Sequence, residues 1–438
     1  MKKHFFLGID LGTSYFKAGI FDETGHLKGL GRQYVEKVTD GVTCELPLDI
    51  FWKTIRACLD EALQMADMQV NDIRSFSYSS QTNSFILLDA HNEPLTPLIL
   101  WPDKRASDIE LPVGDAAELM RRTGLGILPD AEFAIAKYNW FRKYRPDIWE
   151  KVSSILSISD YLTFSLTGQK ACDYSTAAMS ALFDIEDHAW WMERLESNGI
   201  KADMLPSPQR TGALVGVTTS NAVNLTGLPQ GIPFCLGGLD HHIAAIGAGI
   251  LSNGYISEST GTVLSCVDYT DVLRPQKNIC VAPGLHPGRF FRLMFDENGA
   301  SSLERYQKNN ASEYSIAELL EMAEQVERES EDQKVYPHNQ QGQQVRAILE
   351  STAHSLQKMV AAIKKDIPIP AVVASGGGSR SELWVKIMSD IVQTPFFIPE
   401  CTELSCMGAA MVGALGIKAF DDYDTLVDAW VRFRKRIT

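Results

Sequence analysis

The spacing of apolar residues predicts strands and a helix in close succession near the N-terminus. Residues His4 to Asp10 and Phe16 to Phe21 have the pattern of strands, and Asp22 to Gly25 has the composition of a turn to a third strand. An amphipathic helix is predicted to begin near Pro47, because apolar residues recur there at spacings of four and three, namely Phe51, Ile55, Leu59, Ala62 and Met65. A strand at Ile73 to Ser79 follows, which indicates a mixed α/β domain.

The second half of the chain repeats this order of elements. The segments "YISEST" and "TVLSCVDY" are predicted strands on either side of Gly261, and "AVVAS" is a predicted buried strand that ends in three glycines. Between them a long helix is predicted from the apolar positions Val345, Leu349, Thr352, Leu356, Met359 and Ile363. The polar stretch from Ser312 to Gln343 is expected to be helix and exposed loop without a core-facing pattern. The repeated order suggests a duplicated domain.

The length and the charge of the chain limit what the protein can be. A chain of 438 residues is expected to form two domains, and we place them at residues 1–242 and 243–438. The net charge of −14 argues against nucleic acid or an anionic membrane as the principal partner. A polyanionic ligand would therefore need a local site, which backbone N–H groups and helix N-termini can provide.

The N-terminus and the cysteines favour a cytoplasmic protein. The first residues, "MKKHFFLGID", lead directly into a strand and lack the apolar run of an export signal. The eight cysteines show neither a Cys-x-x-Cys motif nor a matched histidine pair, which favours reduced thiols over disulfides or zinc. Apolar stretches are far shorter than the roughly 20 residues that a membrane span needs.

Three glycine-containing turns have residue types suited to phosphate binding. In "GIDLGTS" a carboxylate, Asp10, ends a strand, and glycine in the next turn lets backbone N–H groups approach a phosphate. "STGT" at Ser259 to Thr262 is a similar turn, and "VVASGGGSRSELW" places Gly376 to Gly378 between a strand and a helix. Each turn alone is equally compatible with an ordinary hairpin or loop. The three together favour a nucleotide site.

A fourth segment supplies a candidate catalytic carboxylate. "FCLGGLDHHIAAIGAG" places Asp240 after a strand with paired glycines and before a helix rich in small residues. Such a carboxylate could accept a proton from a substrate hydroxyl. The alternative is that Asp240 only caps the helix, which is the commonest use of Asp at that position. Capping does not account for the two glycines before it.

These motifs together resemble the FGGY family of carbohydrate kinases, in the superfamily of sugar kinases, Hsp70 and actin, and the resemblance is xylulokinase-like. "GIDLGTSYFKAGIFD", "ISESTGT" and "ASGGGSRSELW" resemble the family's two phosphate motifs and its adenosine motif, and "GGLDHHIAAIGAG" resembles the stretch with the catalytic Asp. "SSQTNSFILLD", "ILWPDKRA", "AKYNWFRKYRP" and "ISDYLTFSLTG" occur between them in the family's order. The resemblance covers nearly the whole chain. It implies an α/β fold of two actin-like (ribonuclease H-like) domains that flank a cleft for ATP and sugar.

The resemblance also implies roles for individual residues. Asp240 would be the general base and Asp10 would position Mg²⁺. ATP would be bound by residues from both domains, namely Gly12, Thr13, Lys17, Thr260, Gly261, Thr262, Gly377 and Gly378. The sugar would contact Gln81, Thr82, Asn83, Trp101, Asp103 and His241. Phosphoryl transfer depends mainly on positioning and charge neutralisation, so these groups form a sufficient set.

The chain departs from the family pattern at several of these positions. Thr82 and Asn83 stand where xylulose-type relatives often have Met-His, and His241 stands where Asn or Gln is frequent, so the sugar cannot be named from the motifs. Trp101 could equally be a core residue. The segment "VYPHNQQGQQVRAIL" is shorter than in relatives, which leaves open how the protein assembles, a homodimer being one possibility.

Two other functions are compatible with this fold. One is a catalytically degenerate sugar- or nucleotide-binding regulator, which ATP-dependent formation of sugar phosphate would exclude. The other is a chaperone-like or cytoskeletal ATPase, which would hydrolyse ATP without sugar. The polar residues Gln81, Asn83 and Asp103 favour an ATP-dependent kinase of a small sugar, ketose or polyol.

Overall fold

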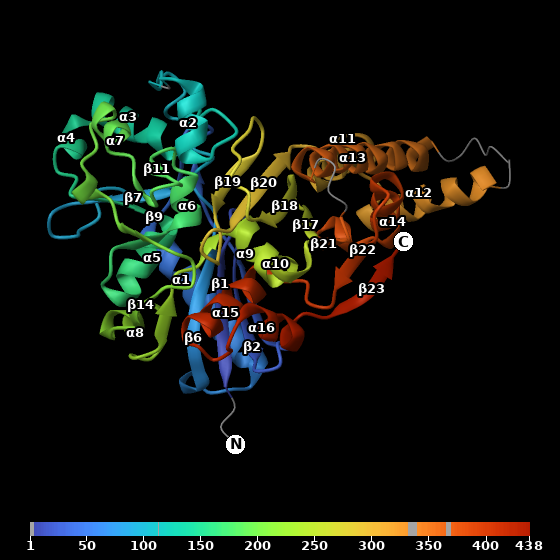
Figure 1. Cartoon of the computed structure of the whole chain (residues 1–438), viewed down its shortest axis with the longest axis horizontal. Helices are drawn as coiled ribbons and strands as arrows, with labels where there is room; N and C mark the ends of the chain where they lie inside the picture. Colours follow the sequence, from blue (N-terminus) through green and yellow to red (C-terminus); the bar gives the residue numbers. More distant parts are fainter. Residues whose placement is uncertain (1–3, 113, 332–339, 365–368) are drawn as a thin grey trace. The chain divides into compact units, whose positions relative to one another are not determined.

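The computed structural model describes residues 4–112, 114–331, 340–364 and 369–438. The chain divides into two compact units (Figure 1). The first unit contains Met1–Gly247, Thr270–Phe291 and Glu403–Trp430, and the second contains Ala248–Tyr269, Arg292–Thr402 and Val431–Thr438. Each unit is thus built from three separate stretches of sequence. The division expected from the sequence, 1–242 and 243–438, assigns one continuous stretch to each domain and stays a prediction.

The first unit is organised around a mixed sheet. Its strands run in the order β14-β15-β6-β1-β2-β3, and β16 also pairs with β6. Their bounds are β1 Phe5–Leu11, β2 Tyr15–Asp22, β3 Leu27–Tyr34, β6 Ile73–Ser80, β14 Leu214–Val217, β15 Pro233–Cys235 and β16 Gly238–Leu239. β1 is antiparallel to β2 and parallel to β6, while β16 is parallel to β6. The strands predicted in the first 80 residues are therefore confirmed.

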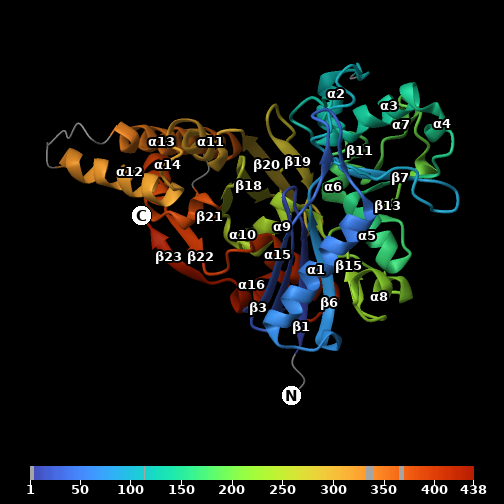
Figure 2. The same ribbon diagram turned by 180° about the vertical axis from the view of Figure 1, so that it is seen from behind.

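Helices cover both faces of this sheet, and alternate residues of β1 contact a helix on one face or the other. Leu7, Ile9 and Leu11 belong to the core cluster that includes helix α1 (Leu48–Ala66). Gly8 points to the other face, where a Cβ on it would lie 1.9 Å from the carbonyl oxygen of Cys406 in helix α15 (Leu404–Gly416). Figures 1 and 2 show the two helices on opposite sides of β1 and β2. Asp10 is two residues after Gly8 on the same strand, so its side chain lies on the same face of the sheet, the one covered by α15.

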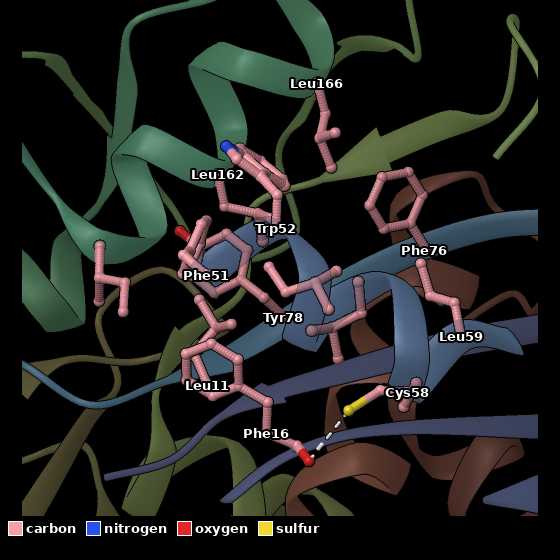
Figure 3. Close-up of a cluster of buried hydrophobic side chains, with 14 of the residues drawn as sticks. Leu11, Phe16, Phe51, Trp52, Cys58, Leu59, Phe76, Tyr78, Leu162 and Leu166 are labelled. Atoms are coloured by element: carbon pink, nitrogen blue, oxygen red, sulfur yellow. Dashed lines mark hydrogen bonds between the residues drawn. The ribbon is translucent and has the colours of Figure 1, made fainter. Parts of the chain in front are cut away.

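The packing of α1 confirms most of its predicted core positions. Phe51, Ile55, Leu59 and Ala62 are buried, and Figure 3 shows Phe51 and Leu59 among the clustered side chains. Truncating such a residue to Ala typically costs about 2–5 kcal/mol. Met65 was expected on this face but is 64% exposed. The reason is its place beside the sheet's edge strand, since its sulfur accepts a hydrogen bond from the N–H of Leu30 in β3.

The rest of the first unit consists of short strands and helices. A second sheet has the order β4-β5-β8-β7-β9, with bounds β4 Val38–Thr39, β5 Cys44–Leu46, β7 Phe85–Leu88, β8 Leu98–Ile99 and β9 Ser154–Ser157. The short strands are β10 Ala171–Asp173, β11 Phe183–Asp184, β12 Ala189–Trp190, β13 Ser207–Gln209 and β19 Cys280–Pro283. The helices are α2 Ala116–Thr123, α3 Ala134–Tyr144, α4 Pro146–Trp149, α5 Ile158–Thr167, α6 Tyr174–Ala178, α7 Met192–Ser197, α8 Ser220–Thr226, α9 Asp240–Gly247 and α16 Tyr423–Trp430.

The second unit has its own sheet, whose strands include the run β18-β17-β21-β22-β23. Their bounds are β17 Ile256–Thr260, β18 Leu264–Thr270, β21 Val372–Gly376, β22 Phe396–Pro399 and β23 Phe433–Ile437, and β20 (Phe290–Asp296) begins at the boundary of the unit. The helices are α10 Ile250–Asn253, α11 Ala300–Asn310, α12 Ile316–Glu331, α13 Gln340–Lys364 and α14 Glu382–Val392. The predicted strands around Gly261, the long helix and the strand "AVVAS" are confirmed.

The polar stretch from Ser312 to Gln343 was predicted without a core-facing pattern, and this is wrong for its first part. Leu319 and Ala323, four residues apart on α12, are fully buried. The two apolar positions were obscured by the many charged residues around them. Residues 332–339, with the start of "VYPHNQQGQQVRAIL", lie outside the described residues.

The strand pairing repeats between the two units. β1 pairs antiparallel with the next strand, β2, and parallel with β6, which follows a helix. β17 likewise pairs antiparallel with β18 and parallel with β21. The duplication predicted from the order of elements is therefore visible as a repeated pairing pattern.

Two further expectations concern the thiols and the membrane. All eight cysteines are free thiols, and all except the half-buried Cys401 are buried. Among the helices that the structure describes, none is long and apolar enough to cross a membrane.

Candidate functional site

Three neighbouring parallel strands of the first unit end at the same edge of the sheet. β6 lies between β1 and β16, so that Ser79 is opposite Asp10 on one side and opposite Gly238 on the other. The carboxyl ends of parallel strands are where open α/β sheets bind ligands. Asp10, Gln81 and Asp240, far apart in the sequence, all lie at or just beyond these ends.

Asp10 is a buried carboxyl group with a cation beside it. Its side chain accepts a hydrogen bond from Ser79 Oγ (2.8 Å), and Lys17 Nζ lies 3.8 Å from its Oδ2. Burial raises the pKa of Asp10 to about 6, whereas Lys17 and Ser79 act in the opposite direction and Asp240 and Glu403 add to the rise. Burial therefore outweighs the neighbouring cation at this carboxyl group.

Asp240 is half-buried and is the first residue of α9. Its Oδ1 accepts a hydrogen bond from the backbone N–H of His241, the next residue (2.8 Å). A capping side chain instead accepts from an N–H two or three positions further on. Of the two glycines before Asp240, the first is explained by packing, because a Cβ on Gly237 would lie 1.7 Å from the carbonyl oxygen of Tyr78. The geometry of Asp240 therefore differs from that of a standard cap.

The turn after Asp10 is linked to predicted sugar-binding residues. Trp101 donates from Nε1 to the hydroxyl oxygen of Thr13 (2.8 Å), and Gln81 donates from Nε2 to the carbonyl oxygen of Gly12 (3.2 Å). A Cβ on Gly12 would lie 2.7 Å from the carbonyl oxygen of Tyr15, so close approach explains this glycine. The structure thus brings predicted phosphate and sugar residues of the first unit together.

Two of the other predicted sugar residues, Asn83 and Asp103, already have partners. Asn83 adopts a positive φ of 60°, accepts from the N–H of Ala134 (3.1 Å) and donates to the carbonyl of Met179 (3.4 Å). Asp103 is fully buried, and its oxygens accept from Arg105 and from the N–H of Cys44 (2.7 Å). The contacts of Asp103 hold the loop that follows Trp101. Sugar contacts by Asp103, Asn83, the half-buried Thr82 and His241 stay predictions.

In the second unit two parallel strands carry the remaining glycine turns. β17 ends at Thr260 and β21 ends at Gly376, and these two residues are opposite each other. The turn Gly261-Thr262 and the loop Gly376–Gly378 are therefore neighbours at one edge of the sheet. Thr262 is exposed, whereas Thr260 is fully buried in this structure.

The glycines of these turns fall into two groups. Gly376 has a φ of 77°, and a Cβ on it would lie 2.7 Å from the carbonyl oxygen of Thr260. A Cβ on Gly378 would lie 2.7 Å from the side chain of Thr260, so both glycines are needed for packing. Around Gly261 and Gly377 the nearest atoms would be 3.7 Å and 3.8 Å away. The fold alone does not require glycine at these two positions, which is the arrangement expected where a ligand approaches the backbone.

The residues at the end of β1 suit a magnesium ion bound together with a nucleotide. Mg²⁺ in phosphoryl-transfer sites is usually held by one or two carboxylates, with phosphate oxygens and waters in the other positions. Asp10 fits, because Ser79 occupies Oδ1 and leaves Oδ2 directed toward Lys17. Among the described side chains no three His, Cys, Asp or Glu groups gather to hold a metal by themselves.

Two charged residues in this region were not singled out from the sequence. Glu403 accepts a hydrogen bond from Lys17 Nζ (2.7 Å) although 386 positions separate the two residues. Lys137 is fully buried, donates to the backbone carbonyls of Leu100, Trp101 and Glu132, and burial lowers its pKa to about 8. Lys137 has a sequence signal, since it is a lone cation in the apolar segment "FAIAKYNWF". Glu403 has none.

Comparison with protein families gives two matches along the chain. Residues 5–247 match the N-terminal domain of the FGGY family of carbohydrate kinases, and residues 325–417 match the C-terminal domain of the same family. The first match alone covers more than half of the chain.

Individual proteins show the same similarity over nearly their whole length. The chain is 26% identical to a gluconokinase of Bacillus licheniformis over 97% of this chain and 90% of the relative. It is also 26% identical to a xylulose kinase of Bacillus subtilis, covering 97% and 91% respectively. The solved structure of gluconate kinase from Lactobacillus acidophilus superposes with a TM-score of 0.87 at 18% identity, covering 99% of this chain and 93% of that chain. The predicted α/β fold of two actin-like domains is confirmed by these structural matches.

Proposed function

The chain belongs to the FGGY family of carbohydrate kinases, and from this premise we propose that Asp240 is the general base that activates the acceptor hydroxyl of a small sugar, ketose or polyol. It is an ATP-dependent carbohydrate kinase, which transfers phosphate to a sugar hydroxyl. The observation that supports the role of Asp240 is the convergence of β1, β6 and β16, which collects Asp10, Gln81 and Asp240 at one sheet edge.

In the proposed reaction the acceptor hydroxyl gives its proton to the Asp240 carboxylate while its oxygen attacks the γ-phosphorus of ATP. The bond between the γ-phosphorus and the β–γ bridging oxygen breaks, and ADP leaves with that oxygen. Lys17 faces the negative charge that develops on the transferred group. Asp10 would hold Mg²⁺, which supplies charge neutralisation at the β- and γ-phosphates when it is bound.

The nucleotide is proposed to contact glycine turns of both units. In the first unit these contacts come from Gly12, Thr13 and Lys17. In the second unit they come from Thr260, Gly261, Thr262, Gly377 and Gly378. The support is the open space beside Gly261 and Gly377, where a phosphate group or the nucleoside can approach the backbone closely. Thr260 ends β17 and would act by holding the turn that follows it, since the whole residue is buried.

The acceptor is proposed to contact Gln81, Thr82, Asn83, Trp101, Asp103 and His241. The hydrogen bond between Trp101 and Thr13 supports a shared site, because it joins the sugar side directly to the phosphate turn. Relatives named for gluconate and for xylulose indicate an acceptor of five or six carbons. With eight free thiols, we further propose that the enzyme acts in the cytoplasm.

The test is a phosphorylation screen with MgATP over xylulose, other pentuloses and hexuloses, gluconate, pentitols and glycerol. We expect ATP-dependent formation of one sugar phosphate, and loss of this product in the absence of acceptor and in the absence of Mg²⁺. Binding of nucleotide and sugar without any product would instead support the regulator. Sugar-independent hydrolysis of ATP would contradict the proposed function.

A further inference from the structure

Lys17 is held by two buried carboxylates in the first unit. Its ammonium donates a hydrogen bond to Glu403 Oε2 (2.7 Å) and lies 3.8 Å from Asp10 Oδ2, which is an ion-pair distance but too long for a hydrogen bond. The carboxylates themselves are only 8% and 9% exposed, while the Lys17 side chain is 23% exposed. Burial is the largest single influence and lowers the pKa of Lys17, but the neighbouring carboxylates Asp10 and Glu403 act against it, and the net result is a raised pKa.

Glu403 does not have the local use that its position would suggest. It immediately precedes α15, where an acidic side chain could cap the helix, yet it makes no side-chain capping hydrogen bond. Its carboxylate is instead directed across the sheet face to Lys17. The Glu403 side chain therefore makes an ion pair with Lys17, which formation of the helix end does not require.

Close backbone contacts fix Glu403 with respect to the proposed reacting groups. A Cβ on Gly8 of β1 would lie 1.9 Å from the carbonyl oxygen of Cys406, and one on Gly19 of β2 would lie 2.8 Å from the Cys406 side chain. Gly8 is two residues before Asp10 on β1, and Gly19 is two residues after Lys17 on β2. On the other side of α15, a Cβ on Gly247 of α9 would lie 2.3 Å from the carbonyl oxygen of Leu404. The N-terminal end of α15 is thus in close contact with β1, β2 and α9, the elements that carry Asp10, Lys17 and Asp240.

We propose that Glu403 is a positioning residue, which keeps the Lys17 ammonium beside Asp10 without letting it bond directly to that carboxylate. This proposal rests on the function proposed above. An ammonium has three N–H donors, and in the part of the chain that the structure describes one of them is assigned, to Glu403. The others are available to a phosphate oxygen. Without Glu403, Lys17 moves onto Asp10 and competes there with Mg²⁺ and with the nucleotide.

The experiment compares Glu403→Gln with Glu400→Gln, an exposed glutamate in the same loop. Affinity for Mg-AMPPNP, a non-hydrolysable ATP analogue, is measured by calorimetry, which needs no acceptor and no turnover. We expect Glu403→Gln to lose about 10- to 100-fold in affinity, since hydrogen bonds between charged groups contribute about 1.5–3 kcal/mol. Glu400→Gln should bind the analogue like the wild type.

A double-mutant cycle with Lys17→Met separates positioning from a merely structural role. If Glu403 acts through Lys17, adding Glu403→Gln to Lys17→Met should change analogue affinity by less than about 2-fold. With a sugar that the wild type phosphorylates, Glu403→Gln should raise KM for ATP and lower kcat while leaving KM for the sugar within about 3-fold. If Glu403 were merely structural, Glu403→Gln would lower the melting temperature and weaken the binding of both substrates, whether or not Lys17→Met is present.

The outcomes distinguish this proposal from the proposed function. Wild-type binding of the analogue without phosphorylation of any sugar contradicts the kinase function but still lets the Glu403 proposal be judged by affinity. A folded Glu403→Gln variant with unchanged analogue affinity overturns the positioning role even in an active kinase. An equal loss in the Lys17→Met background overturns it as well.

Discussion

Asp240 is the side chain on which the proposed chemistry depends most. Asp240→Asn keeps the size and hydrogen bonding of the group but removes its charge and most of its basicity. We expect turnover at saturating substrates to fall by roughly 10²–10⁴-fold, the usual range for general-base catalysis, with much smaller changes in substrate affinity. The measurement is the rate of sugar phosphate formation, together with a melting curve of the same variant. Near-normal turnover would remove Asp240 from the mechanism, because Asn caps a helix about as well as Asp.

Gly261 tests the nucleotide site of the second unit. Gly261→Val should retain the fold, since the first added carbon meets nothing closer than 3.7 Å and the residue does not need a positive φ. We expect loss of MgADP binding by at least about tenfold, because the side chain would occupy the space proposed for phosphate. Lys358→Val, at an exposed position on α13, serves as the control, and unchanged MgADP affinity in folded Gly261→Val would contradict this site.

The sequence predicted single residues well only where a local motif pointed to them. Asp10 and Lys17 lie in one hairpin, and their register follows from the turn between them. The burial of Asp103 by Arg105 could not be foreseen, because an acidic residue in a loop has the same local pattern whether it faces a ligand or an arginine. Glu403 escaped notice because its partner is remote in the sequence.

Helix α15 packs closely against its neighbours, and two of its glycines offer a matched test. A Cβ on Gly408 would lie 1.9 Å from the carbonyl oxygen of Ile243 in α9, whereas one on Gly413 would lie 3.2 Å from the hydroxyl of Ser75. We expect Gly408→Ala to destabilise the first unit by about 3 kcal/mol or more, because backbone cannot move aside easily. Gly413→Ala should stay within about 1 kcal/mol, since helix propensity favours Ala. Chemical denaturation of both variants checks this, and equal stability would contradict the close packing of α9 and α15.

The boundaries of strands and helices were predictable to the extent that apolar periodicity defines them. β1, β2, β6, β17 and α1 occur where the pattern placed them. The pattern failed at Met65 and on α12 because it contains no information on where a sheet ends or which neighbour covers a charged helix. Both depend on contacts made by distant segments.

The stability of the complete chain should depend on pH through Glu258. This fully buried carboxyl accepts a hydrogen bond from the Thr260 hydroxyl, and burial raises its pKa to about 8. The folded protein therefore retains a proton that the unfolded chain releases above its ordinary pKa of 4.5. The stabilising contribution is complete below pH 4.5 and is lost as the pH rises to about 8, with a limiting slope of about 1.4 kcal/mol per pH unit.

Glu258→Gln removes this titration, so the variant should gain in melting temperature relative to the wild type between pH 5 and pH 8. The difference between the two proteins is the useful quantity, because burial also raises the pKa of Asp160, to about 7, and this carboxyl titrates in both proteins. Parallel melting profiles across this range would show that Glu258 is not protonated in the folded state. Glu382→Gln, an exposed carboxyl of the same unit, should leave the pH profile unchanged.

The composition of the units is the aspect that the sequence could least predict. Local patterns describe neighbouring residues, whereas the packing of Glu403–Trp430 with Met1–Gly247 joins segments that are far apart in the sequence. Such an assignment rests on contacts between segments separated by more than 150 residues, and only the folded structure contains them.

This arrangement has a consequence for biosynthesis. As a ribosome releases the chain, the strands β1, β2 and β6 emerge early, but α15, which covers the face with Gly8 and Gly19, is made almost last. A nascent chain of 250 residues therefore still exposes that face, and its Asp10 and Lys17 lack the neighbouring Glu403. We expect a fragment of residues 1–250 expressed alone to aggregate or to bind chaperones. Co-expression of residues 251–438 should restore soluble protein if the two fragments can assemble, so the enzyme would acquire its active site only after nearly all of the chain has been translated.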